Sequence, residues 1–190
     1  MGFRVLVEII RRVRGLSNIL TTLILLIIAV LLAFVVTYYS TNAVMIRSET
    51  EELHFRNEHI WVNSTGAVAA FKLQALGGKD VLIDEIRVRG VEQSWMDVYC
   101  YRVPSGMIIT GDMNVTSYAR FSGTSVTING RVYEQATDDI PLCSGSELLV
   151  YIKDPDNVKV GNEGKKATIS IVTNNAKYTT ELHVDTSTRQ

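Results

Sequence analysis

The sequence predicts an α+β protein in which a long N-terminal hydrophobic α-helix precedes an all-β, immunoglobulin-like sandwich. Three observations predict this fold class. No charged residue occurs between Leu16 and Ile46. Neither glycine nor proline, the two residue types that interrupt helices, lies between Gly15 and Gly66. Beyond about residue 57 the pattern changes to short alternating segments separated by turn residues, which is typical of strands.

The uncharged segment is long enough to cross a membrane. It covers 31 residues, and its centre from Leu23 to Val36 is entirely apolar. A bilayer core of about 30 Å needs roughly 20 apolar residues in a helix. A buried helix of a soluble domain would carry a polar stripe, which residues 23–36 lack. The segment therefore predicts insertion in the cytoplasmic membrane when the chain is first made.

The charges on either side of this segment predict its orientation. Residues 1–15 contain four arginines and one glutamate, whereas Glu49, Glu51 and Glu52 follow the apolar segment. Because basic residues stay on the cytoplasmic side, the N-terminus is expected inside and the rest of the chain outside. The formal net charge of −1 argues against a nucleic-acid partner, which normally requires a basic face.

The helix is expected to run unbroken from about Leu16 to Arg56, near 60 Å at 1.5 Å per residue. At its C-terminal end, Val44, Ile46, Leu53 and Phe55 alternate with charged residues. This amphipathic end is expected to dock on the following domain.

Seven to nine short strands are expected in the β domain, at the spacing of an immunoglobulin-like sandwich. Asn129-Gly130 predicts a type I′ hairpin turn between two of them. Asn174-Asn175 predicts a second hairpin. Alternation over residues 96–101 predicts that Met96, Val98 and Cys100 share one buried face. The other expected strands include residues 86–89, 126–128, 131–133, 148–152, 168–171 and 178–184.

The junction from Arg11 to Ile19 places basic residues, one glycine and an apolar helix in succession. This arrangement resembles the class III signal of archaeal type IV pilins and archaellins. The resemblance implies that a prepilin peptidase cuts between Gly15 and Leu16, directly after the glycine, which Arg14 precedes. It further implies the pilin-like arrangement of three segments. Residues 1–15 are a cleaved leader, and residues 57–190 are an extracellular β domain. Between them, residues 16–56 form a helix that is transmembrane before assembly and forms the filament core afterwards. The fifth mature residue is Leu20, where bacterial pilins carry a glutamate.

Removing the leader has a physical purpose. A charged residue at the centre of a bilayer costs about 2.5–3.5 kcal/mol, so the leader arginines would hold the helix in the membrane. Without them the helix can move from lipid into a bundle of identical helices, which is similarly apolar. Head-to-tail contacts that do not close into a ring then generate a filament. The residues expected in its core include Leu20, Leu26, Ala29, Leu32 and Ala33.

Two further patterns concern the external domain. An even number of cysteines in an oxidising compartment favours a disulfide between Cys100 and Cys143, and two buried free thiols are the alternative. Asn63-Ser64-Thr65 and Asn114-Val115-Thr116 match the acceptor pattern for glycosylation, which also arises by chance.

No catalytic, metal-binding or cofactor motif stands out, so the sequence predicts neither an enzyme nor a cofactor. The leading hypothesis is the structural subunit of an archaeal type IV pilus, an adhesive surface filament. Its partners would be identical subunits, the prepilin peptidase, an assembly ATPase and a membrane platform. Two alternatives stay open: an archaellin of the swimming filament, and a monomeric single-pass protein that binds ligands at the cell surface.

Overall fold

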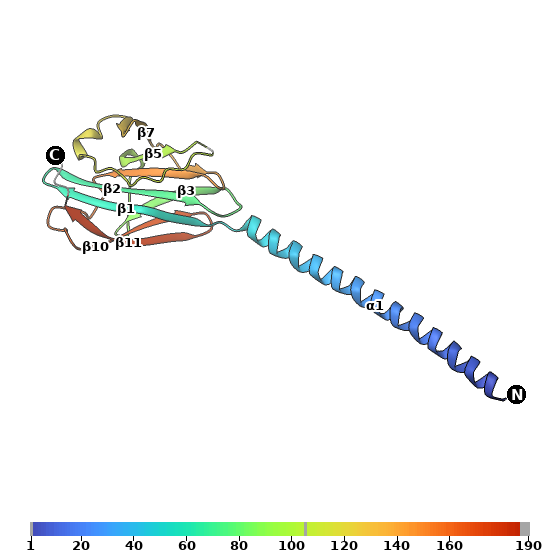
Figure 1. Ribbon diagram of the computed structural model, residues 1–190. Coiled ribbons are helices and arrows are strands. Elements are labelled where there is room, and N and C mark those ends of the chain that lie inside the picture. Colours follow the sequence, from blue (N-terminus) through green and yellow to red (C-terminus); the bar gives the residue numbers. More distant parts are fainter. Residues whose placement is uncertain (1, 105, 187–190) are drawn as a thin grey trace. The chain divides into compact units, whose positions relative to one another are not determined.

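The computed structural model describes residues 2–104 and 106–186, with the backbone alone for residues 2–17 and 46–48. The chain divides into two compact units, Met1–Arg47 and Ser48–Gln190. The first is helical and the second is built of strands (Figure 1). The expected fold class, a long N-terminal helix followed by an all-β domain, is confirmed.

The helix α1 (Gly2–Glu49) is continuous, as the lack of glycine and proline beyond Gly15 predicts. It ends before the expected Arg56, because strand β1 (Leu53–Asn63) already begins at Leu53. Leu53 is buried in the core of the β domain and Phe55 packs against that core. The alternation of these two residues with His54 and Arg56 therefore has the period of a strand, and the expected amphipathic helix end is wrong.

The described residues form eleven strands in two sheets that are joined at one edge (Figure 1). In the first sheet β1 is followed across the sheet by β2 (Gly66–Ala75), β9 (Glu147–Lys153), β5 (Val98–Arg102), β7 (Arg131–Gln135) and β6 (Ser125–Ile128). The second contains β4 (Val91–Glu92), β3 (Val81–Val88), β10 (Lys166–Thr173) and β11 (Lys177–Thr186), with β8 (Ile140–Leu142) beside β3. Two 3-10 turns, η1 (Trp95–Asp97) and η2 (Tyr118–Arg120), complete the described elements.

The joint between the sheets is a short parallel pairing. The end of β11 lies beside β1, with Ile60 opposite Val184 and Val62 opposite Thr186. The other strand pairs among the described residues are antiparallel. The parallel pairing brings together the first and last strands that the structure describes.

Two apolar cores lie on the two faces of the first sheet. One is formed with the second sheet and contains Phe71 and Val150 together with Ile169. The other lies beneath the connection between β5 and β6 and contains Tyr151 and Phe121. Strands β2 and β9 are therefore buried on both faces, as a continuous apolar run such as residues 148–152 predicts.

Both predicted hairpins are confirmed. Asn129 and Gly130 have positive φ angles of 50° and 74° between β6 and β7, as a type I′ turn requires. Asn174 and Asn175 lie in the turn between β10 and β11. The prediction for Met96 is wrong: it lies in η1 rather than in a strand, and it is 71% exposed.

Candidate assembly surface and the polar contacts that organise the β domain

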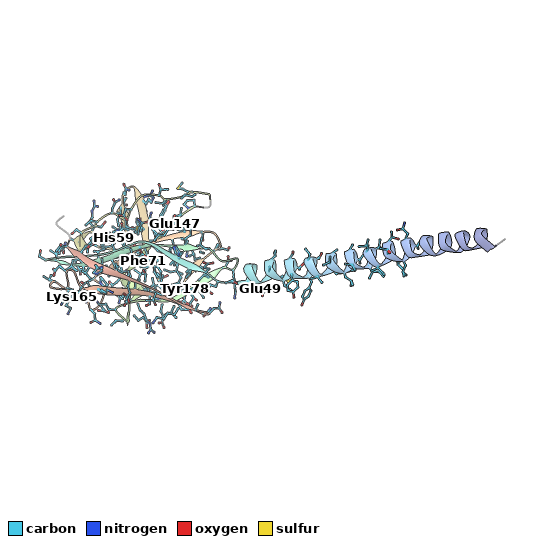
Figure 2. All side chains as sticks on the ribbon, turned by 60° about the horizontal axis from the view of Figure 1, so that its bottom comes forward. Glu49, His59, Phe71, Glu147, Lys165 and Tyr178 are labelled. Carbon is cyan, nitrogen blue, oxygen red and sulfur yellow. The ribbon has the colours of Figure 1, made fainter. Side chains whose placement is uncertain are left out.

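The candidate functional surface begins with helix α1, which carries the exposed apolar side chains. From Asn18 to Met45 the helix is long and apolar enough to cross a membrane, and none of the segment is buried. At 1.5 Å per residue its 28 residues span about 42 Å. Figure 2 draws the described side chains of α1 as sticks around the helix, and those of the β domain as a closely packed set. In water this surface requires a partner, which can be lipid or protein.

Two of the hydroxyl groups in this segment are hydrogen-bonded within the helix. Thr37 Oγ1 donates to the carbonyl of Ala33, and Thr41 Oγ1 donates to the carbonyl of Thr37, each at 2.8 Å. Hydroxyl groups satisfied within the helix can enter an apolar environment without losing a hydrogen bond. Ala29, Ala33, Thr37 and Thr41 recur every four residues, so they form a row of small side chains along one face.

The residues that follow the helix are fixed to the β domain by a set of hydrogen bonds centred on Glu51. Its carboxylate accepts hydrogen bonds from Thr173 Oγ1 and, at 2.8 Å, from Asn175 Nδ2. Its backbone carbonyl accepts from the hydroxyl of Tyr178 at 3.0 Å. The hairpin between β10 and β11 therefore holds the segment that links α1 to β1.

Gly77 allows the same segment to lie close to the turn after β2. Its N–H and that of Leu76 both donate to the carbonyl of Glu52, at 3.3 and 2.8 Å. A Cβ atom at position 77 would lie 2.2 Å from the carbonyl oxygen of Thr50, which is far inside contact distance. Only glycine fits between these two backbone segments.

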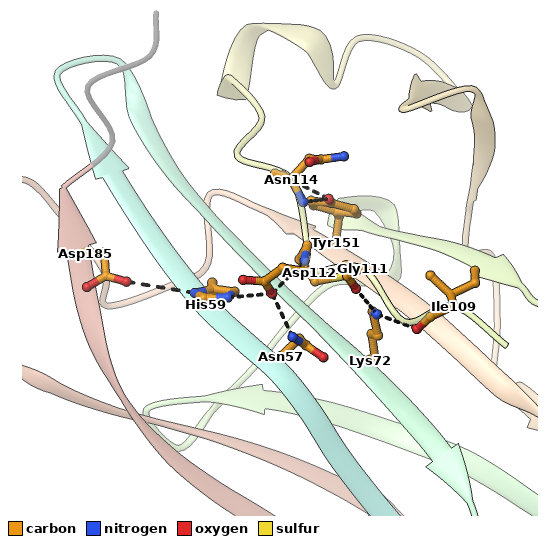
Figure 3. Close-up of polar contacts among 10 residues, drawn as sticks. Asn57, His59, Lys72, Ile109, Gly111, Asp112, Asn114, Tyr151 and Asp185 are labelled. Carbon is orange, nitrogen blue, oxygen red and sulfur yellow. Dashed lines mark hydrogen bonds and ion pairs between the residues drawn. The ribbon is translucent and has the colours of Figure 1, made fainter.

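A second set of contacts holds the connection between β5 and β6 against the first sheet (Figure 3). Lys72 lies in the middle of β2 and is 1% exposed. Its Nζ donates to the backbone carbonyl of Ile109 at 2.8 Å and to that of Gly111. A buried ammonium group must be hydrogen-bonded, so these carbonyls fix the connection in place.

His59 and Asp112 form the other part of this arrangement. We call the three residues His59, Lys72 and Asp112 the loop clamp. Asp112 Oδ1 lies 2.9 Å from His59 Nε2 and accepts hydrogen bonds from Asn57 Nδ2 at 2.9 Å and from the N–H of Met113 at 2.8 Å. His59 Nδ1 lies 3.9 Å from Asp185 (Figure 3), and the ring of His59 stacks on Trp61. This histidine thus joins the connection to both β1 and β11.

The electrostatics of the loop clamp follow from these contacts. Burial acts to raise the pKa of Asp112, but the hydrogen bonds from His59, Met113 and Asn57 outweigh it and lower the pKa below its usual value. Next to it, Tyr151 exchanges hydrogen bonds with the backbone N–H and carbonyl of Asn114, at 3.1 and 2.9 Å. Burial raises the pKa of Tyr151, so its hydroxyl remains a donor.

We expect acid to loosen this clamp. A carboxylate whose pKa is lowered in the folded state stabilises the fold when the pH is above its pKa in the unfolded chain, about 3.9. This stabilisation is lost as the pH falls through the folded-state pKa. Proteolysis within residues 106–124 should therefore accelerate below about pH 4. Asp112→Asn should accelerate it at pH 7 by roughly fivefold, the effect of one net hydrogen bond of about 1 kcal/mol. Asp156→Asn, in the exposed loop after β9, is the control, and equal cleavage of both variants would contradict the role of Asp112.

The predicted disulfide is absent, since Cys100 and Cys143 are both free. Cys100 lies in β5 opposite Val150, whereas Cys143 lies in the turn that precedes β9 at Glu147. The strand from Glu147 to Val150 alone spans about 10 Å. A disulfide requires Cα atoms roughly 4.4–6.8 Å apart. Burial raises the pKa of the Cys100 thiol, while Cys143 is exposed.

The remaining sites of the sequence analysis lie in separate parts of the chain. The backbone at Arg14, Gly15 and Leu16 is helical, and their side chains lie outside the described residues. Leu20, Leu26, Ala29, Leu32 and Ala33 are all exposed on α1. Asn63 ends β1, and Asn114 lies in the connection before β6. Within the described part of the chain, no three His, Cys, Asp or Glu side chains gather as metal ligands would.

Sequence reasoning missed Glu51, Lys72, Gly77 and Asp112. Lys72 alone gave a local signal, because a lysine within the apolar run of residues 67–73 is unusual. The partners of the others lie far along the chain: Glu51 meets Asn175, and Asp112 meets His59. No local pattern indicates such pairs.

No protein-family model matches this chain, and no curated protein resembles it at a significant level. The fold and the candidate surface define an α+β protein with one N-terminal apolar helix that can anchor in a membrane, followed by a β domain.

Proposed function

We propose that this chain is the structural subunit of an archaeal type IV pilus and that it polymerises through α1. The observation that carries the proposal is the long, predominantly apolar surface of residues 18–45, none of which is buried. At about 25 cal/mol per Å² of apolar area, exposing it to water would cost tens of kcal/mol. Lipid satisfies this surface before assembly, and identical helices satisfy it in the filament.

Two features support a change of environment from lipid to helix bundle. The hydroxyl groups of Thr37 and Thr41 are satisfied within the helix, and the row containing Ala29 and Ala33 allows close approach of a neighbouring helix. The four arginines within residues 1–15 oppose this change, and cleavage after Gly15 would remove them.

Electron microscopy of material sheared from the cell surface tests the proposal. Thin filaments whose mass-spectrometric composition is this chain, with α1 at the axis, are the expected result. A protein recovered only as single copies in detergent would instead indicate the membrane-anchored, ligand-binding alternative. Filaments connected to a rotary motor would indicate the archaellin alternative.

Processing is expected between Gly15 and Leu16. The N-terminal sequence of surface-extracted protein should begin at Leu16, because a small residue precedes the cut and the apolar helix follows it intact. Gly15→Val enlarges the residue at the cut and should leave the precursor in the membrane. We expect at least a tenfold loss of surface protein, which corresponds to an increase of about 1.4 kcal/mol or more in the activation free energy of cleavage. Val7→Ala, eight residues before Gly15 and outside the junction from Arg11 to Ile19, is the control. A mature chain that begins at Met1 would exclude this processing.

A further inference from the structure

The two glycosylation sequons differ in how the folded chain presents them. Asn63 is the last residue of β1, and Ser64 and Thr65 are exposed in the tight turn that leads to Gly66 at the start of β2. The sequon at Asn114 lies in the connection between β5 and β6, beside the loop clamp.

At the first sequon, the side-chain oxygen of Asn63 collects three hydrogen bonds from the residues just after it. Oδ1 accepts from the N–H of Thr65 at 3.0 Å, from Thr65 Oγ1 at 2.7 Å and from the N–H of Gly66 at 3.0 Å. All three use the oxygen of the amide. The nitrogen Nδ2, the atom that carries an N-linked sugar, takes part in none of them.

At the second sequon, the threonine is hidden. Thr116 is 5% exposed, and its hydroxyl lies 3.3 Å from the backbone carbonyl of its own Asn114, to which it donates. The backbone of Asn114 is in turn held on both its N–H and its carbonyl by Tyr151. An enzyme that must read the hydroxyl of the third residue can reach Thr65 in the folded protein but not Thr116.

We propose that Asn63 is the N-glycosylation site of this protein and that Asn114 is not modified. The donor would be an oligosaccharide joined to a polyisoprenoid lipid through phosphate, used by a membrane transferase. A bond forms between Asn63 Nδ2 and the anomeric carbon of the first sugar. The bond from that carbon to the phosphate oxygen breaks, the lipid phosphate leaves with the electron pair, and a base of the transferase takes one Nδ2 proton.

The hydrogen bonds at Asn63 favour this step. As Nδ2 loses its proton, negative charge develops on Oδ1 of the amide, and donors already positioned on that oxygen stabilise the charge. The three donors from Thr65 and Gly66 are in place before the sugar arrives. The inference requires the β domain to lie outside the cell but does not require polymerisation.

Mass spectrometry of tryptic peptides tests the assignment, using full-length protein extracted from the surface of the cells that produce it. The peptide with Asn63 should carry a hexose-containing mass increment, and the peptide with Asn114 should be unmodified. Asn63→Gln and Thr65→Ala should each remove the increment from the intact protein by at least tenfold. Thr65→Ser, which keeps the hydroxyl, should restore it.

The matched variants Asn114→Gln and Thr116→Ser should leave the mass increment unchanged. An unmodified Asn63 in the native protein, or an increment that persists in Asn63→Gln, overturns the proposal. Filaments are scored separately on the same cells by electron microscopy. Glycosylated protein without filaments would count against the pilus function alone, and filaments of unmodified protein would count against this assignment alone.

Discussion

Cells that produce the Leu26→Asp variant should display no filaments of this protein. Leu26 lies in the uncharged part of α1 and is 62% exposed in the isolated chain, so in a filament it would face neighbouring helices. One aspartate costs about 2.5–3.5 kcal/mol at the centre of a bilayer, which a long apolar helix tolerates. In a polymer the same cost recurs in every subunit, and the carboxylates of adjacent copies also repel one another. Leu32→Asp should have the same effect.

Electron microscopy of sheared surface material measures the outcome, and membrane fractionation shows that the variant is still inserted. Val160→Asp is the control, because Val160 is an equally apolar residue, 64% exposed, in the loop after β9. Its filaments should be as abundant as those of the original protein. Normal filaments from Leu26→Asp would exclude α1 as the polymer core.

Gly77→Ala should strongly destabilise the β domain, although it adds only one methyl group. That group would lie 2.2 Å from the backbone oxygen of Thr50 and 2.6 Å from the backbone nitrogen of Glu52. Backbone atoms cannot relieve such a clash by a change of rotamer, as side-chain atoms can. Relief requires the linking segment to move away, which breaks the bonds from Leu76 and Gly77 to Glu52. We expect a loss of about 3 kcal/mol or more, at the upper end of overpacking effects.

Thermal unfolding of the detergent-solubilised chain measures this loss, and about 3 kcal/mol should lower the midpoint by roughly 10 °C for a domain of this size. Gly111→Ala is the control, since an added Cβ there meets no atom within 4 Å. Its midpoint should change by no more than about 2 °C, as for ordinary surface substitutions. Equal midpoints for both variants would show that the contact between Gly77 and Thr50 is unimportant.

The sequence predicted the elements that depend on local pattern. The uncharged run after Leu16 predicted the helix, and Asn129-Gly130 predicted a hairpin turn that the positive φ angles confirm. Strand β2 was not predicted, because its alanines have low strand propensity and it is buried on both faces, so it shows no alternation. The helix end was misplaced because residues 50–52 contain no helix-breaking residue. The hydrogen bonds of Glu51 to distant residues hold this segment out of the helix.

The sequence predicted those parts of the candidate site whose residues lie close together along the chain. The apolar helix is one continuous segment, so composition alone indicated it. The loop clamp joins His59, Lys72 and Asp112 from parts of the chain that only the folded sheet brings together. The disulfide prediction failed for the same reason, because the number of cysteines says nothing about the strand positions that separate Cys100 from Cys143.

The position of β1 has a mechanical consequence for a chain that polymerises through its helix. The polypeptide passes from α1 into β1 through the segment fixed by Glu51, and β1 lies between β2 and β11 rather than at an outer edge. Tension on the helix, with the β domain held by its neighbours, therefore enters the domain at the N-terminal end of β1, and its component along the strand acts on the hydrogen bonds of β1. The hydrogen bonds to β2 run perpendicular to the strand, so this load shears the whole β1–β2 ladder at once. Bonds loaded together resist jointly, whereas bonds peeled from a free edge fail one after another.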